Sequence, residues 1–95
     1  MIQLLLLAAL IGDGNVRWLE WGGPTRDFHV PDAALAPSWP TEGPRRIWSR
    51  ELGDGYSAVL ADGSHLYTVF RRNNQNVAIA LDAASGRTTW EQAFD

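Results

Sequence analysis

Hydrophobic and polar positions divide the chain into three regions of different pattern. Residues 2–11 are an almost unbroken apolar run, interrupted by Gln3. Residues 15–44 keep no sustained period and are rich in proline, glycine and tryptophan, so regular strands are not expected there. From Arg46 onward, short runs of apolar and β-branched residues alternate with Gly, Asp and Asn clusters. That pattern is typical of β-strands joined by tight turns.

The C-terminal region predicts an antiparallel meander preceded by an edge strand. We expect the edge strand at 47–52, ending in a turn at 53–55. The strands of the meander are expected at 56–61, 65–71, 77–81 and 88–94. Asp62-Gly63 is a sequence signal for a hairpin turn of type I′, and residues 73–76 are expected to form a polar loop.

The strand expected at 77–81 is apolar on both faces. Its side chains alternate between Val, Ile and Leu on one face and alanine on the other. A sheet with one solvated face would alternate apolar with polar residues, so this pattern indicates a sheet covered on both sides. Trp48 and Trp90 stand in similar strands 42 residues apart. A period of about 40–45 residues with four strands per unit is the spacing of propeller blades.

The stretch between the last two strands carries the most specific motif. Asp82 can hydrogen-bond the amides just ahead of it, and Gly86 can adopt the positive φ that such a turn demands. Ala80, Asp82, Gly86 and Trp90 together resemble the repeat signature of the pyrroloquinoline-quinone (PQQ)-type β-propellers. In that family the motif joins blades and does not contact the cofactor. The resemblance implies an all-β fold in which residues 46–95 form a single four-stranded antiparallel propeller blade with a preceding edge strand, as a fragment of a larger propeller.

Residues 15–45 are expected to form an extended lead-in segment, rich in Trp and Pro. Its tryptophans argue against disorder, because disordered chains are poor in aromatic residues. We expect these side chains to pin the segment over a larger body. The stretch from Trp21 to Asp27 resembles the Trp-x-Gly-Pro-x-Arg-Asp lead-in that precedes the first blade in many exported PQQ-repeat proteins.

The N-terminal apolar run fits a secretory signal peptide, which we place at residues 1–14. It is too short to span a bilayer as a helix, which needs about 20 residues. No Lys or Arg precedes the run and no Ala-x-Ala cleavage site follows it, so a truncated signal or an apolar strand stays open as an alternative. A signal peptide would direct export to the periplasm or another part of the cell envelope.

Composition narrows the choice of function. The chain has 95 residues, a net charge of −3 and no cysteine, and it takes all its positive side-chain charge from arginine. A nucleic-acid-binding surface should be clearly basic, so nucleic acid is not expected as a partner. Without cysteine, no disulfide can support so small a core.

The candidate reactive side chains do not form a catalytic constellation. Asp82 could act as an acid or a calcium ligand, but calcium needs about six or more oxygens, and the turn explains this residue better. His29 and His65 lack metal-ligand spacing, and Ser57 lies in no nucleophile elbow. We therefore expect no catalytic, cofactor-binding or metal-binding residues.

The leading hypothesis is a non-catalytic structural or interaction module, the first blade of an exported, BamB-like propeller that binds other proteins. Further propeller blades and other envelope proteins are then the expected partners. The alternative is the N-terminal fragment of a PQQ-dependent quinoprotein dehydrogenase whose catalytic residues lie in further blades, and only that alternative involves PQQ. A weaker alternative, suggested by the aromatic content alone, is a sugar- or polymer-binding propeller. Because one blade is a single layer, we expect that the chain alone is not a stable monomer.

Overall fold

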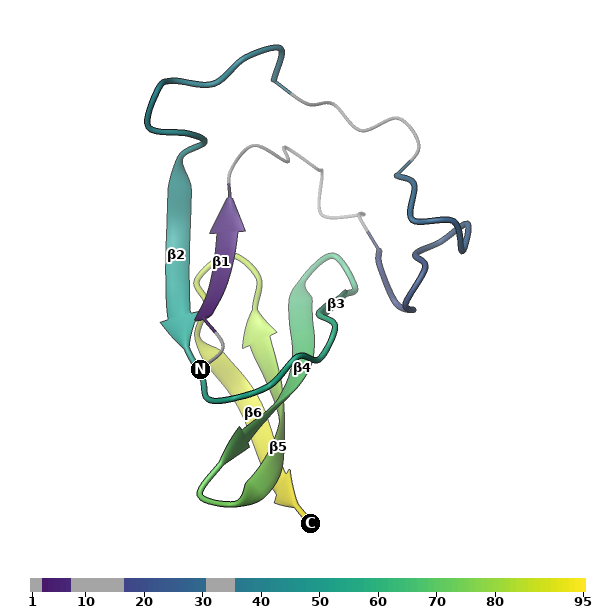
Figure 1. The fold of residues 1–95 in the computed structure, drawn as a ribbon, viewed down its shortest axis with the longest axis vertical. Helices are drawn as coiled ribbons and strands as arrows, with labels where there is room; N and C mark the ends of the chain where they lie inside the picture. Colours follow the sequence, from purple (N-terminus) through teal and green to yellow (C-terminus); the bar gives the residue numbers. More distant parts are fainter. Residues whose placement is uncertain (1–2, 8–16, 31–35) are drawn as a thin grey trace.

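The computed structural model describes residues 3–7, 17–30 and 36–95, and all regular structure in these ranges is β. The strands are β1 (Gln3–Leu7), β2 (Arg46–Glu51), β3 (Leu60–Ala61), β4 (His65–Arg72), β5 (Gln75–Asp82) and β6 (Thr88–Phe94). β1 and β2 form an antiparallel pair, and β3 to β6 form a four-stranded antiparallel sheet in chain order (Figure 1). The all-β prediction and the four-stranded antiparallel sheet are confirmed.

The strand expected at 56–61 is wrong for most of its length. Asp54 bridges to Arg71 of β4, and Leu60 pairs with Tyr67, so five residues lie opposite three between these two points. The extra residues cannot be paired in a regular ladder, so the chain leaves β4 over residues 55–59. Tyr56 is fully exposed as a result. The edge strand expected at 47–52 is β2, displaced by one residue.

Both hairpin turns of the sheet differ from the prediction, and the type I′ turn expected at Asp62-Gly63 is wrong. Asp62 N–H donates to the carbonyl of His65 at 3.2 Å, so the turn residues between β3 and β4 are Gly63 and Ser64. Of these two, Gly63 alone has a positive φ, of 100°, which is the pattern of type II′. The type I′ pattern lies at Asn73 and Asn74, with φ of 54° and 63°. The polar loop expected at 73–76 is therefore wrong, because two asparagines, which tolerate this conformation, close the hairpin alone.

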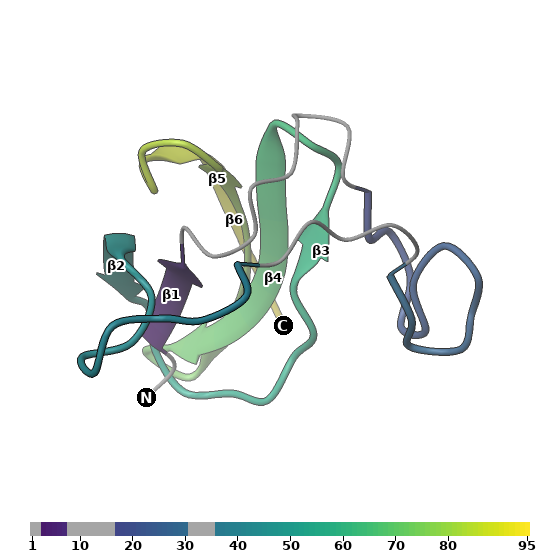
Figure 2. The ribbon, with the colours of Figure 1, turned by 90° about the horizontal axis from the view of Figure 1, so that it is seen from above.

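The core lies on one face of the sheet. Leu66, Thr68 and Phe70 of β4 stand opposite Leu81, Ile79 and Val77 of β5, and all six are buried. Five partly buried side chains pack against this cluster, namely Trp48, Leu52, Val59, Ala61 and Ala83. Figure 2 shows β1 and β2 together on one side of the sheet. This face is thus covered by β2 and by the segment that leads from β2 to β3.

The opposite face of the sheet, which we call the open face, carries small residues between aromatic ones. The register aligns Tyr67, Ala80 and Trp90 in one row across β4, β5 and β6. The side chains of Trp90 and Phe94 are 48% and 44% exposed, while Ala80 between its neighbours is fully buried. Within the described residues, the partly buried hydrophobic side chains that extend the core all lie on the other side.

The described part of the lead-in touches the sheet through Trp18. Its backbone pairs with Ala61 through two hydrogen bonds of 2.7 and 2.8 Å, which extends the sheet beyond β3. The Trp18 ring lies so close to Gly23 that a Cβ there would stand 2.5 Å from it. Trp21 and Trp39 are 71% and 49% exposed, so Trp18 is the tryptophan that attaches this segment to the sheet.

Candidate functional site: a tryptophan docked on the Asp82 turn

The turn between β5 and β6 is organised by the Asp82 carboxylate. Oδ1 accepts hydrogen bonds from the N–H of Ala84 at 3.0 Å, from the N–H of Ser85 at 2.9 Å and from the Ser85 hydroxyl at 3.0 Å. The N–H of Gly86 donates to the Asp82 carbonyl at 2.8 Å. Gly86 has φ of 74°, so the predicted positive φ is confirmed. A glycine adopts this conformation without the steric cost of a Cβ.

The same hydrogen bonds fix the charge of Asp82. The amide and the hydroxyl of Ser85 hold the pKa of this carboxyl below its usual value, and the amide of Ala84 and the charge of His65 act in the same direction. The group is therefore an anion at neutral pH whose Oδ1 is engaged by the turn. This arrangement suits turn capping, since a general acid would need a raised pKa.

Trp48 of β2 docks on this turn. Its Nε1–H donates to the carbonyl of Ala83 at 2.9 Å. Its ring lies against Gly86 so closely that a Cβ there would stand 2.6 Å from Cδ2 and Cε3. Arg50, two residues further along the same face of β2, donates to the Gly86 carbonyl at 2.6 Å and to the Thr88 hydroxyl at 3.1 Å. Two side chains of β2 thus hold one turn of the following sheet.

The four residues of the sequence motif divide between two places. Asp82 and Gly86 form the turn, whereas Ala80 and Trp90 lie side by side on the open face through their pairing across β5 and β6. Sequence reasoning missed the tryptophan that covers the turn, Trp48, and missed Arg50 beside it. The available signal was the 42-residue spacing between Trp48 and Trp90, which stand in similar predicted strands.

A second polar cluster lies at the turn between β3 and β4. The Asp62 carboxylate accepts from the Tyr67 hydroxyl at 2.6 Å and from the amides of His65 and Ser64 at 2.7 and 2.9 Å. The Tyr67 hydroxyl and these amides lower the pKa of Asp62 far below its usual value, and the carboxylate in turn raises the pKa of Tyr67. The cluster therefore carries a stable anion that ties the turn to β4.

The Asp62 cluster contains a serine and a histidine in contact. The Ser64 hydroxyl lies 2.9 Å from Nδ1 of His65 and also donates to Asp62 at 3.1 Å. In a catalytic triad the histidine stands between the serine and the carboxylate, so that it can take the serine proton. Here the carboxylate accepts from the serine directly, so the three groups form a turn and are not in the order that a triad requires. Ser57 and His29 lie elsewhere and are exposed, and His29 faces Asp27 at 3.2 Å.

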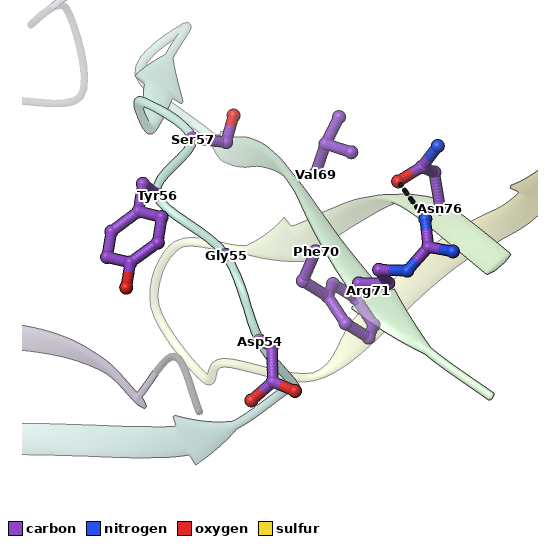
Figure 3. A pocket seen from close by; sticks show the side chains of 8 residues that line it. All are labelled: Asp54, Gly55, Tyr56, Ser57, Val69, Phe70, Arg71 and Asn76. Carbon is purple, nitrogen blue, oxygen red and sulfur yellow. Dashed lines mark hydrogen bonds between the residues drawn. The ribbon is translucent and has the colours of Figure 1, made fainter. Parts of the chain in front are cut away.

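An open groove of about 400 Å³ lies where the chain leaves β4 (Figure 3). Its lining includes Tyr56, Val69, Phe70 and Arg71, and the Tyr56 side chain extends away from the other three (Figure 3). Arg71 is held by the Asn74 carbonyl at 2.9 Å. The groove lies where the five residues 55–59 stand opposite three residues of β4 and leave the ladder.

The described residues contain no group of three or more His, Cys, Asp or Glu side chains arranged to hold a metal ion. Over the same ranges, none of the structure is a helix with the length and apolar character needed to cross a membrane. Compared with known proteins, the chain matches no family model, no curated protein and no solved structure.

Proposed function

We propose that this chain is a non-catalytic structural and interaction module: one four-stranded blade, with its lead-in, of an exported PQQ-like β-propeller repeat protein that acts as a protein-binding scaffold. The observation that carries the proposal is the docking of Trp48 on the Asp82 turn of the sheet that follows it. β2 contributes this tryptophan while staying outside the four-stranded sheet. In the proposal, β2 takes the place of the outer strand of a neighbouring blade.

The open face supports the same assembly. A blade in a propeller is covered on both faces by its neighbours, and repeat units of this kind bury their apolar faces only against one another. Here β2 and the following segment cover one face, while Trp90 stands about half exposed on the other. In the proposal, Trp90 docks on the corresponding turn of the next blade, as Trp48 docks on Gly86.

The polar groups of the chain favour a scaffold over a catalyst. Asp62 and Asp82 are anions that accept several hydrogen bonds from their own turns, so their charges stabilise the loops of the blade. The lead-in offers exposed aromatic side chains to partner proteins, because Trp21 and Phe28 form an edge-to-face pair at 5.6 Å on the surface of a turn. Export rests on the apolar N-terminal run, and other envelope proteins are the expected partners.

The proposal can be tested with a tandem chain in which residues 1–90 are followed by a second copy of residues 49–95. At the junction, Trp90 takes the place of Trp48 before residue 49 of the second copy. It is therefore separated from the second Asp82 turn by the same number of residues that separate Trp48 from the first. We expect the tandem chain to unfold cooperatively and at higher temperature than the single chain, measured by circular dichroism. Trp90→Ala in the first copy should remove about 3–5 kcal/mol, the usual cost of emptying a buried Trp site.

Trp39→Ala is the matched control, because this tryptophan is also about half exposed but lies in the lead-in. It should leave the melting temperature of the tandem chain unchanged. A tandem chain that melts like the single chain, or that loses nothing with Trp90→Ala, would show that the open face does not dock on a second blade.

A further inference from the structure

The outer edge of β6 is unpaired in the part of the chain that the structure describes. The sheet runs in the order β3-β4-β5-β6, so β6 hydrogen-bonds with β5 on one side only. Every residue from Thr88 to Phe94 is exposed. An edge strand presents a row of backbone donors and acceptors that can pair with another strand.

The register identifies which backbone groups of β6 point outward. Arg71 exchanges both of its backbone hydrogen bonds with Asp54, on the β3 side, so its partner Asn76 must bond toward β6. Asp82, on the same side of β5 as Asn76, does donate toward β6, to Arg87 at 2.8 Å. Trp90, Gln92 and Phe94 pair with alternate residues of β5 that have the same orientation as Asn76 and Asp82. Their backbone groups therefore bond inward, to β5. The N–H and C=O groups of Glu91 and Ala93 therefore point away from the sheet.

This edge lacks most of the devices that keep strands apart. It has no lysine and no proline, and its single charge, on Glu91, is paired with Arg72 at 2.6 Å. The register skips Thr89, which makes a bulge at one end of the strand only. The side-chain amide of Gln92 donates to the outward carbonyl of Ala93 at 3.0 Å, in the place where a neighbouring strand would donate.

We propose that the outer edge of β6 pairs with β6 of a second copy of this chain, antiparallel, with Gln92 opposite Gln92 of the second copy on the two-fold axis. Glu91 then stands opposite Ala93 of the second copy, and the two exchange both outward backbone hydrogen bonds. On the open face, Trp90 stands opposite Phe94 of the second copy. The dimer joins two four-stranded sheets into one continuous sheet.

The side chains favour this register over its neighbours. Centring the pair on Glu91 would place two carboxylates opposite each other, and centring it on Ala93 would place Glu91 opposite Asp95. Like charges directly opposite destabilise a strand pair. Centring it on Trp90 would place the bulged Thr89 next to the two-fold axis, opposite Glu91, whereas the Gln92 register leaves Thr89 at the end of the ladder. The Gln92 register avoids these conflicts and sets two aromatic pairs across the junction, which stabilise antiparallel strands.

The inference does not depend on the proposed propeller. It uses only the edge of β6, which is exposed in the chain as it stands, whereas blade docking uses the open face. Crosslinking between the two copies of residue 92 separates the two contacts, because blade docking does not set two β6 edges side by side.

Single cysteines test the register directly, because the chain has no cysteine of its own. At a non-hydrogen-bonded antiparallel pair the Cα atoms stand about 4.5 Å apart, a distance that a disulfide spans. Gln92→Cys should therefore give a covalent dimer under mild oxidation. Thr89→Cys is the matched control on the same exposed strand, since the two copies of residue 89 would stand about 20 Å apart. It should stay uncrosslinked.

Charge substitutions test the non-covalent dimer, measured by analytical ultracentrifugation of the full chain. Gln92→Lys sets two ammonium groups opposite each other on the two-fold axis and should raise the dimer dissociation constant at least about threefold. Thr89→Lys adds the same charge opposite Asp95 of the second copy and should leave the constant unchanged or lower it. A monomeric chain, equal crosslinking of the two cysteine variants, or a dimer insensitive to Gln92→Lys would overturn the proposal.

Discussion

Replacing Gly86 by alanine should expose how the Trp48 docking site is built. Two separate costs are expected. An alanine held at φ of 74° should lower the free energy of unfolding of the chain by roughly 1–2 kcal/mol, because its Cβ is crowded in the left-handed region. The new Cβ would also stand 2.6 Å from the Trp48 ring, which must shift by roughly 1 Å to reach an ordinary contact. Overpacking of this kind costs about 1–3 kcal/mol.

Gly43 separates the two costs. Its φ is 90°, but a Cβ built there meets nothing within 4 Å. Gly43→Ala should therefore cost only the conformational part, about 1–2 kcal/mol, while Gly86→Ala costs about 2–5 kcal/mol. Urea unfolding followed by circular dichroism measures both, at one fixed protein concentration, because self-association contributes to stability.

The Trp48 indole proton gives a second measurement at the same site. In the wild-type chain it is hydrogen-bonded to the Ala83 carbonyl, so it should exchange slowly with solvent in nuclear magnetic resonance spectra. Displacing the ring should speed this exchange in Gly86→Ala and leave it unchanged in Gly43→Ala. Equal destabilisation by the two substitutions, or an indole proton that stays protected in Gly86→Ala, would refute the docking argument.

Four further results are expected. In a Tyr56→Phe chain, where Tyr67 is the remaining tyrosine, ultraviolet absorbance should show its phenol ionising above pH 10, and Asp62→Asn should bring the midpoint back toward 10, because the raised pKa depends on that carboxylate. The pKa of Asp62 is lower in the folded than in the unfolded chain, so its contribution to stability is present above about pH 4 and is lost as the pH falls through the folded value. Asp62→Asn should therefore make the free energy of unfolding, measured with urea, fall less steeply as the pH is lowered. At the type I′ turn, Asn73→Val should lower the free energy of unfolding by about 1–2 kcal/mol while Asn73→Gly does not, and equal thermal melts would contradict the turn assignment. Residues 1–20 fused to a reporter that is active only outside the cytoplasm should give activity, and a silent fusion retained in the cytosol would count against export.

The elements predicted from the sequence are those with strong local signals. The strand at 65–71 and the strand at 88–94 follow from β-branched and aromatic residues, and the structure places β4 and β6 there. The turn at Gly86 also follows from local chemistry, since Asp82 and a glycine at this spacing favour one conformation. The strand at 77–81 is two residues longer at its start, because Gln75 and Asn76 continue the ladder up to the hairpin turn.

The features that could not be predicted depend on distant partners. Tyr56 and its neighbours have strand-like composition. Because Asp54 and Leu60 are both paired with β4, however, the five residues between them lie opposite only three and cannot form a regular ladder. Trp48 contacts a carbonyl 35 residues away, and no local pattern indicates which turn a tryptophan will cover. The β1–β2 pair joins Gln3–Leu7 to a strand 43 residues later, and the signal peptide placed at 1–14 stays a prediction.

The separation in sequence between Trp48 and the Asp82 turn has a consequence for the rates of folding and unfolding. The hairpins β4–β5 and β5–β6 join neighbouring segments and can form within microseconds, whereas the Trp48 contact must close a much longer loop. We expect the hairpins to be formed in the transition state and the tryptophan to dock after it. Substitutions at Asn73 should then slow folding, and substitutions at Gly86 should mainly speed unfolding, which stopped-flow measurements can separate. In that case the rate at which the native chain unfolds is set by how long the Trp48 ring stays docked on Gly86.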